Sequence, residues 1–430
     1  MDMVRCPAEF HWQIHRQPDR DFMMTVGMTT TAQLTMAIFV LTIGPRATVH
    51  AETTDGGAVA INADFPGGNV AVLKNRGNVV RVAPDLRGDR PWFYWYYEAK
   101  ASKPGRVKFV FPDRVAGFKN GAIGFQGPAI SLDLGATWKW MGTDNVDGSS
   151  FFFDFAQAHQ RVRFAVTIPY VQTELEQFLQ KNAANPHLKT SVLTKSRHGR
   201  EVELLQIGVH GPQVKAVLVT ARHHAAETIA SYVLEGFLQE AISNSPAGEE
   251  FRARYVLYAV PLVDKDGVEE GDQGKNRQPH DHNRDYGVDS IYPEVQAIKE
   301  LDERENFQFA LDIHCPTLVM KDHQVMYFVG AKEHPKYNFE NVSEFANRIK
   351  SGLPKDAPYG PLVWLRSEND PAPKNSRYFG FKDNAIMAAT LEIPFAPPGK
   401  ATDPASCRKY GQVMLQAWVN THFRAEDKGE

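Results

Sequence analysis

The sequence has 430 residues, of which 43% are hydrophobic and 23% charged, and its formal net charge is -3 at pH 7. This composition is that of an ordinary globular protein, and the length favours two domains. The near-neutral charge provides no basic surface, so it argues against nucleic acid or an anionic membrane as a partner. The common phosphate-binding loops and the serine motif GxSxG are absent, which argues against those enzyme classes.

The first 51 residues have the features of a targeting segment. An apolar run extends over 32–44, and the following Val49-His50-Ala51 is small at the positions a signal peptidase reads. The run is too short to span a bilayer comfortably, so we expect no membrane span in the mature chain. We therefore predict a signal peptide over 1–51 and a periplasmic or secreted protein. The alternative is a cytoplasmic protein with a disordered or weakly helical tail.

Residues 52–166 predict a small all-β sandwich domain. Short runs of β-branched and aromatic residues alternate with Gly, Pro and Asp at intervals typical of a sandwich. The clearest runs are AVAINADF at 58–65, NVVRVAP at 78–84, PWFYWYYEAK at 91–100 and GRVKFVFP at 105–112.

From residue 167 to 425 the pattern changes to alternating strands and helices. This alternation predicts an α/β domain with a mixed, largely parallel sheet and helices on both faces. We expect strands at 215–220, 254–263, 307–313, 324–330 and 385–393, and helices at 173–184, 225–243, 292–303, 338–350 and 408–423.

Two adjacent histidines follow the first of these strands. His223 and His224 lie in the expected strand-to-helix turn, and Glu227 falls three residues after His224 in the first helical turn. A histidine and a glutamate three apart can reach one cation, and ligand sites in α/β folds lie at the carboxyl ends of strands. The alternative for such a short motif is a polar pair that covers a strand end.

A third donor strengthens the prediction of a metal site. His314 directly follows the expected strand 307–313. Two strand ends in one parallel sheet point to the same crevice, and His, Glu and His with an open fourth position is typical of catalytic Zn²⁺. The three cysteines, Cys6, Cys315 and Cys407, are too few for a cysteine-based zinc site. One Zn²⁺ per chain is therefore expected, held by histidines and a carboxylate.

Two further features are suited to catalysis. Glu392 lies near the end of an apolar strand, and burying a carboxylate there costs free energy unless the group is paired with a partner or takes part in function. The long polar stretch 263–287 follows another strand and contains Arg277, Asn283 and Arg284. On charge alone, that stretch would be a solvated loop.

The order of these motifs resembles the zinc metallocarboxypeptidases of the carboxypeptidase A clan. HxxE is followed by DG…R…DxNR, then by a strand that ends in His, then by a strand with Glu. The resemblance covers about 85 to 425 and is greatest to the cytosolic carboxypeptidase-like branch, whose members carry a β-sandwich before the catalytic domain. It implies a carboxypeptidase-like fold and a zinc-dependent enzyme that hydrolyses the C-terminal bond of a peptide or protein.

The resemblance also implies roles for the residues around the metal. His224, Glu227 and His314 match the three ligands, and His223 would be a neighbour, such as a pocket wall. Asp281 matches the carboxylate that orients the first imidazole.

A second set of roles concerns the substrate. Arg277 matches the arginine that polarises the scissile carbonyl, and Asn283 and Arg284 match the pair that holds the terminal carboxylate. Glu392 matches the general base. Tyr378 is the nearest match to the family's tyrosine over the terminal residue, although the alignment there is loose.

Two other functions remain open. The same fold and metal would suit an amidohydrolase of N-acyl amino acids like the aspartoacylases, and an inactive relative could bind peptide or glycan. The motifs favour the peptidase. They leave open the preferred terminal residue, the oligomeric state, the start codon and whether Cys315 pairs with Cys407.

Overall fold

The computed structural model describes residues 56–275, 277–319, 324–331, 336–354, 363–367, 372–397 and 402–424. The expected signal peptide at 1–51 lies outside these residues, so export stays a prediction. Val49–Glu430 cluster as one compact unit. The boundary expected between 166 and 167 falls inside this unit, after the last sandwich strand, and also stays a prediction.

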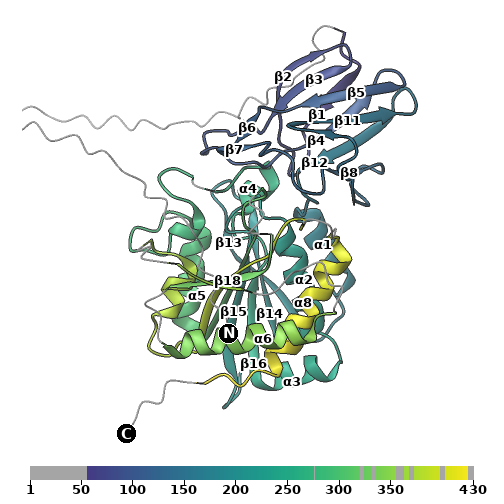
Figure 1. Ribbon diagram of the computed structural model, residues 1–430. Coiled ribbons are helices and arrows are strands. Elements are labelled where there is room, and N and C mark those ends of the chain that lie inside the picture. The colour runs from purple at the N-terminus through teal and green to yellow at the C-terminus, as the bar shows by residue number, and fades with distance from the viewer. Residues whose placement is uncertain are drawn as a thin grey trace, which may run out of the picture. The chain divides into compact units, whose positions relative to one another are not determined.

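The amino-terminal part of this unit consists of two five-stranded sheets (Figure 1). All neighbouring strands are antiparallel except β3 and β5, which are parallel. In spatial order, the first sheet contains β1 (Val59–Asn62), β4 (Tyr96–Ala101), β12 (Arg161–Ala165), β8 (Ala129–Ser131) and β9 (Lys139–Trp140). The second contains β10 (Val146–Asp147), β11 (Ser150–Phe155), β5 (Gly105–Val110), β3 (Val79–Ala83) and β2 (Ala71–Arg76). A separate ribbon pairs β6 (Arg114–Val115) with β7 (Phe118–Lys119).

An aromatic core joins these two sheets. Phe109 on β5 and Phe151 on β11 both contact Phe164 on β12, with ring centroids 5.2 and 5.3 Å apart. Because the first two belong to one sheet and the third to the other, the sheets pack face to face. This part is therefore a β-sandwich, as the sequence predicts.

The rest of the unit is built on one eight-stranded mixed sheet. In spatial order its strands are β13 (Leu188–Lys195), β14 (Glu201–Ile207), β16 (Tyr255–Val260), β15 (Lys215–Ala221), β17 (Phe309–His314), β20 (Met387–Glu392), β18 (Tyr327–Ala331) and β19 (Val363–Ser367). The central β16, β15, β17 and β20 are parallel, as are β18 and β19, and the other pairings are antiparallel.

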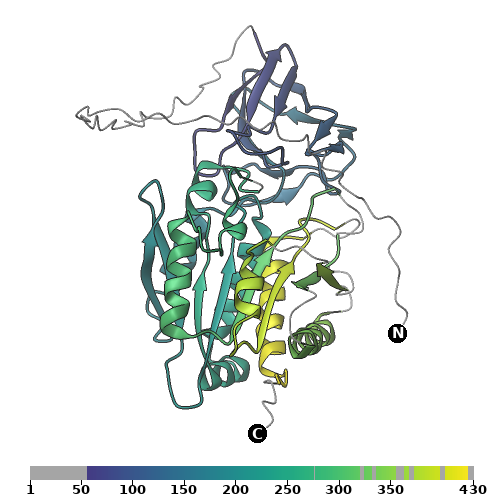
Figure 2. The ribbon, with the colours of Figure 1, turned by 90° about the vertical axis from the view of Figure 1, so that its left-hand side faces the viewer.

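Helices cover both faces of this sheet. They are α1 (Gln172–Lys181), α2 (Ile229–Ala241), α3 (Pro246–Arg254), α4 (Lys265–Glu270), α5 (Pro293–Glu305), α6 (Lys336–Gly352), α7 (Asn375–Gly380) and α8 (Pro404–Val419), with a 3₁₀ turn η1 (His282–Arg284). Leu218 packs in a cluster with Val295 and Ile298 of α5, whereas Val219 belongs to the core of α2 and α8. Figure 1 shows α5 on one side and α2 and α8 on the other, and Figure 2 shows α5 in front of the sheet. The predicted α/β fold is confirmed.

Two glycines allow α2 and α8 to pack closely. A Cβ atom at Gly236 would lie 1.9 Å from the carbonyl oxygen of Arg408, and one at Gly411 would lie 2.0 Å from that of Val233. Neither position tolerates a side chain unless the helices move apart. This contact holds α2 against the sheet, directly after the turn that carries the two histidines.

Several elements were not predicted. β13 and β14 form an antiparallel pair before β15, and most side chains of β13 are exposed. An edge strand with solvent around it lacks the apolar pattern that identifies buried strands. The short α4 lies inside the stretch expected to be a loop, and α3, α7 and β19 were also missed.

Hydrogen bonds join the sandwich to the loop after α4. The buried Gln273 side chain accepts from the amide of Tyr94 at 2.8 Å and donates to its carbonyl at 2.8 Å. Asn69 donates to the carbonyl of Gly271 at 2.7 Å. The sandwich therefore fixes the backbone of this loop, which leads to the candidate site.

Among the described helices, none combines the length and the apolar character that crossing a membrane requires.

Candidate active site

The turn after β15 is held by a buried arginine. Arg222 has a left-handed backbone conformation, with φ of 66°. Its guanidinium donates to the carbonyl of Tyr170 at 2.7 Å and to Ser231 Oγ at 3.1 Å, and it also donates to the carbonyl of Ala225 inside the turn. These bonds satisfy buried backbone oxygens and fix the path of residues 222–227.

Three donor side chains converge beyond this turn. The Nδ1 atom of His314 lies 2.7 Å from Glu227 Oε2 and 3.1 Å from His224 Nδ1, and His224 Nδ1 lies 2.9 Å from Glu227 Oε1. All three side chains are buried. α2 begins only at Ile229, so Glu227 lies in the turn and not in the first helical turn as predicted. The turn itself, closed by a bond from the Glu227 amide to the His224 carbonyl at 3.1 Å, brings the two side chains together.

A chain of buried hydrogen bonds supports His314 from behind. Its Nε2 lies 2.5 Å from Asp312 Oδ2, and Asp312 Oδ1 contacts His223 Nδ1 at 2.8 Å and accepts from Thr220 Oγ1 at 2.8 Å. Burial acts to raise the pKa of Asp312, but the two imidazoles together hold that pKa well below its usual range. Asp312 therefore fixes the ring of His314 with Nδ1 towards the other donors.

The structure separates the roles of the two adjacent histidines. His223 Nε2 lies 2.8 Å from the hydroxyl of Tyr286, so both of its ring nitrogens have partners. His224 directs Nδ1 to the cluster, while its Nε2 lies 3.5 Å from Asp281 Oδ1. Burial acts to raise the pKa of Asp281, but the His224 imidazole holds it well below its usual range. Asp281 thus lies where a carboxylate can orient His224, as the resemblance implies.

The donor set fits a zinc ion. Each of His224, Glu227 and His314 offers one ligand atom, and these atoms lie within 4.8 Å of one another. Two imidazole nitrogens and a carboxylate oxygen that face one point need a cation in common, and these donor types suit Zn²⁺. His223, Asp312 and His314 also lie close enough to hold an ion. In that second set, His223 also bonds to Tyr286 and Asp312 also accepts from Thr220, so these side chains have partners outside the set and the first set fits better.

Glu392 lies beside this cluster. It ends β20 and is paired in register with His314 on the adjacent parallel strand β17. Burial, together with the charge of Glu227, raises the pKa of its carboxyl. Within the described part of the chain, its buried Oε2 has no hydrogen-bond partner. A carboxylate in this state is suited to exchange a proton with a bound molecule.

Arg277 does not lie at the cluster. Its guanidinium contacts Asp264 Oδ1 at 2.8 Å, Asp272 Oδ2 at 3.0 Å and Asp89 Oδ2 at 3.5 Å. We call Arg277 and these three aspartates the arginine cage. In the described part of the chain, Lys275 is a cation that does approach the cluster, and it was not predicted from the sequence.

Asn283 and Arg284 lie in η1. Asn283 is close to His314, and Arg284 is close to Asp281, the carboxylate beside His224. Asn283 is buried, its Nδ2 lies 3.4 Å from His314 Nε2, and its Oδ1 accepts from the amide of Asn375 at 3.1 Å. Arg284 keeps 28% of its side chain exposed, and its Nη1 lies 3.9 Å from Asp281 Oδ1. Arg284 can therefore meet an entering anion.

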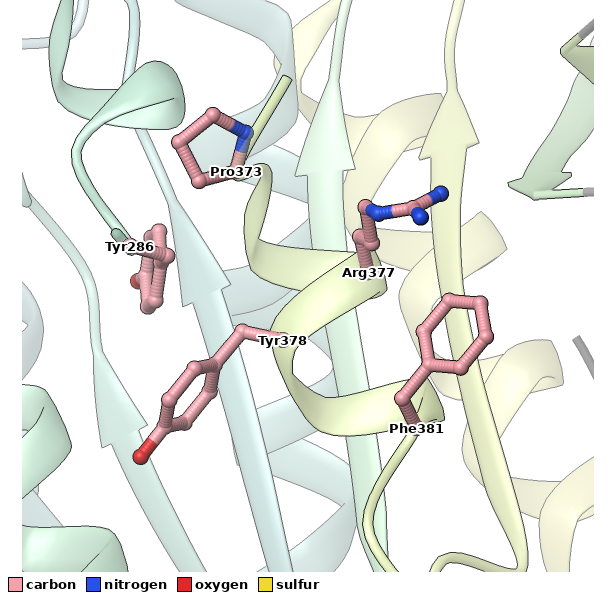
Figure 3. A pocket seen from close by; sticks show the side chains of 5 residues that line it. All are labelled: Tyr286, Pro373, Arg377, Tyr378 and Phe381. Carbon is pink, nitrogen blue, oxygen red and sulfur yellow. The ribbon is translucent and has the colours of Figure 1, made fainter. Parts of the chain in front are cut away.

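Tyr378 is not brought to the cluster. Its ring contacts Tyr286, and burial, followed by the charge of Asp302, raises the pKa of its hydroxyl to about 12. In Figure 3 the hydroxyl points away from the arrowhead ends of the strands. The figure shows a pocket of about 260 Å³, lined by Tyr286, Pro373, Arg377, Tyr378 and Phe381.

The sequence analysis missed Asp312 and Lys275. Asp312 could have been found, because it precedes His314 by two residues on a strand and so lies on the same face. Lys275 offered no local signal, since a lysine in a polar loop is usually solvated. Cys315, next to His314, keeps a buried free thiol, so it does not pair with Cys407.

Comparison with known proteins gives a consistent result. The family model described as zinc carboxypeptidase matches residues 175–291. Cytosolic carboxypeptidase 2 of Xenopus tropicalis is 28% identical over 218 residues, which cover 46% of this chain and 22% of that protein. Cytosolic carboxypeptidase 2 of Mus musculus is 33% identical over 266 residues, covering 54% of this chain and 31% of that protein. The chain thus spans less than a third of the length of these two relatives.

The fold is also found in a solved structure. The metallo-carboxypeptidase of Burkholderia cenocepacia superposes with a TM-score of 0.72 at 20% identity, over 84% of this chain and 98% of that one. Residues 175–291 thus match the zinc carboxypeptidase family, the chain is similar in sequence to the cytosolic carboxypeptidases, and the structural match shows a shared fold.

Proposed function

We propose that this protein is a zinc-dependent metallocarboxypeptidase, which hydrolyses the C-terminal peptide bond of peptides or proteins. The observation that carries the proposal is the convergence of His224, Glu227 and His314, with Glu392 paired in register beside His314. The three would hold one Zn²⁺, and Asp281 and Asp312 would keep the two imidazoles in the required orientation. When bound, zinc supplies Lewis acidity, which lowers the pKa of a water molecule and polarises a carbonyl group.

Glu392 acts as the general base in this proposal. It accepts a proton from the attacking water and returns it to the leaving amine, so the net reaction adds one water across the peptide bond. The raised pKa of Glu392 supports this role, because burial and the charge of Glu227 favour the protonated carboxyl that the step produces.

Asn283 and Arg284 bind the free terminal carboxylate of the substrate. Support comes from the partly exposed guanidinium of Arg284, since a guanidinium and a carboxylate form strong charge-assisted hydrogen bonds. The proposal gives no such contact to Tyr378, whose hydroxyl points away from the carboxyl ends of the strands (Figure 3). It also gives no substrate contact to Arg277, whose charge is met by three carboxylates.

Substrate selection tests this function. We expect Arg284→Ala to lower kcat/KM for a free-acid peptide by about 10²–10⁴-fold and to change cleavage of the matched C-terminal amide far less. The two enzymes and two substrates form a double-mutant cycle, which isolates the contact between Arg284 and the carboxylate. Equal losses on both substrates would contradict the assignment. Release of N-acyl groups without release of C-terminal residues would favour an amidohydrolase instead.

We also propose that the protein is exported and processed. The support is the apolar run at 32–44 followed by Val49-His50-Ala51. Amino-terminal sequencing of protein from the native host should find a mature chain that begins at Glu52. Intact protein beginning at Met1 in a cytoplasmic fraction would contradict export.

A further inference from the structure

The charge of Arg277 is satisfied within the chain. Three carboxylates surround its guanidinium, and one of them, Asp89, comes from the sandwich part. Asp264 is held in turn by the amide of Gly267 at 3.0 Å. To meet a substrate oxygen, Arg277 would have to leave buried ion pairs, which is strongly unfavourable. The residue that the resemblance assigns to the scissile carbonyl is therefore committed elsewhere.

A second cation of the same loop, Lys275, faces the three proposed zinc ligands His224, Glu227 and His314, which we call the metal-ligand cluster. Lys275 Nζ lies 3.3 Å from His224 Nδ1 and 3.8 Å from Glu227 Oε1. It also lies 5.9 Å from the ring centroid of Trp92, and 21% of its side chain is exposed. The ammonium thus borders the proposed zinc position, and the side chain that carries it is partly exposed to solvent.

The backbone explains why Lys275, and not Arg277, reaches this place. Gly274 has a positive φ of 72°, and a Cβ atom there would lie 2.3 Å from the backbone nitrogen of Ala225. The backbone of the loop at Gly274 therefore packs in direct contact with the turn that carries His224. The Gly274 amide donates to Asp89 Oδ2 at 3.2 Å, so the same aspartate that contacts Arg277 also fixes the residue before Lys275.

We propose that Lys275 is a catalytic residue that contacts the oxygen of the scissile carbonyl, while Arg277 is a positioning residue that holds the loop in place. This inference rests on the proposed peptidase function. Lys275 donates hydrogen bonds to the oxygen as negative charge develops on it, and it keeps its own proton throughout. A donor placed at such an oxygen acts most strongly where water is excluded, and losing one typically costs about 10²–10³-fold in rate.

The test compares Lys275→Met with Lys275→Arg, Arg277→Met and the exposed control Lys189→Met, all on the full zinc-loaded chain. Three quantities are measured for each: zinc content, the thermal unfolding midpoint, and calorimetric affinity for a peptide phosphonate that mimics the tetrahedral intermediate. Turnover is measured on a free-acid peptide and its matched amide.

For Lys275→Met we expect normal zinc content, an unchanged unfolding midpoint and loss of about 10²–10³-fold in kcat/KM and in phosphonate affinity. The factor should be the same for the acid and the amide, because the carbonyl is common to both. Lys275→Arg should recover part of the loss, since the charge is kept. Arg277→Met should lower the unfolding midpoint and weaken the phosphonate less than Lys275→Met does. Lys189→Met should match the wild type.

Several results would overturn the inference. In one, Lys275→Met binds the phosphonate as the wild type does. In a second, its loss is confined to the free-acid peptide, which would make Lys275 part of the carboxylate site. Loss of zinc from Lys275→Met would also overturn the inference. So would a loss of phosphonate affinity that is larger in Arg277→Met than in Lys275→Met. A wild type that cleaves neither peptide would overturn the proposed function and this inference with it, whereas an active wild type matched by Lys275→Met would overturn the inference alone.

Discussion

The metal-ligand cluster and the arginine cage are two groups of buried charges in the same unit. They differ in whether the central positive charge comes from a residue of the protein itself. In the cage, the guanidinium of Arg277 meets three carboxylates of its own chain. In the cluster, two imidazole nitrogens and the carboxylate of Glu227 face one another, and among the described residues Lys275 brings a positive charge close. A buried cation whose charge is met by carboxylates of its own chain is structural, whereas an excess of metal-ligand atoms around one point indicates that a ligand completes the site.

The difference also explains why two cations of one loop have different roles. Asp89 belongs to the sandwich part and contacts Arg277, so the cage links the two parts of the unit and orders the loop. Lys275 lies two residues before Arg277, so the ordered loop backbone also holds Lys275 in a fixed position. Changes in the cluster should therefore affect metal and catalysis, and changes in the cage should affect stability.

The largest effect is expected from removing a metal ligand. His224→Ala should reduce bound zinc to well below one ion per chain and abolish turnover, because one of three protein ligands is lost. Elemental analysis of the purified variant measures this directly. Full zinc occupancy would mean that His223 is the ligand, despite the bonds that both of its nitrogens make.

The next largest effect is expected from the base. Glu392→Gln keeps the size of the side chain but cannot accept a proton, so kcat should fall by about 10²–10⁴-fold. Zinc content should remain that of the wild type, since Glu392 is not one of the three ligands. Steady-state kinetics with parallel metal analysis separates these outcomes, and near-normal turnover would place the base elsewhere.

A smaller effect is expected from the support of His314. Asp312→Asn leaves a hydrogen-bonding group of the same shape but removes the charge that contacts the ring. Zinc affinity should fall by about 10–100-fold, which competition with a chelator measures. An unchanged affinity would show that the contact between Asp312 and His314 does not act on the metal site.

These predictions depend on residues that the sequence identified with unequal success. His224, Glu227, His314 and Glu392 could be proposed because they lie at the end of an apolar strand or in the turn that follows one, and parallel strands bring such ends together. The arginine cage could not be found, because Asp89 is far from Arg277 in sequence and only the packed sandwich brings them together. The segment that carries Glu227 was predicted to be helical from its local sequence pattern. It is a turn instead, because the buried hydrogen bonds of Arg222 hold the backbone in another conformation.

The last effect is expected in the cage, where it changes stability and not metal binding or turnover, and it depends on pH. Burial, with a further contribution from the charge of Asp264, raises the pKa of Asp272 from 3.8 to about 6, although Arg277 lowers it. A carboxyl whose pKa is raised by folding stabilises the folded state at low pH, and this contribution is lost as pH rises from about 4 through 6. Asp272→Asn stays neutral throughout.

The free energy of unfolding of Asp272→Asn should therefore rise relative to that of the wild type between about pH 4 and 7. The change should be at most about 3 kcal/mol, because one pKa unit corresponds to about 1.4 kcal/mol. Denaturant unfolding at several pH values measures it. A variant that becomes less stable relative to the wild type as pH rises would show that the pairing of Asp272 with Arg277 outweighs its burial.

The central claim is that the cluster cuts peptides at a free carboxyl end. The most direct measurement is cleavage of a free-acid peptide and its matched C-terminal amide by the zinc-loaded wild type, followed by mass spectrometry. We predict release of single residues from the C-terminus, with kcat/KM for the acid about 10²–10⁴-fold above that for the amide, and loss of both activities with a zinc chelator. Equal cleavage of the two peptides, internal cuts, or full activity in the presence of the chelator would contradict the account.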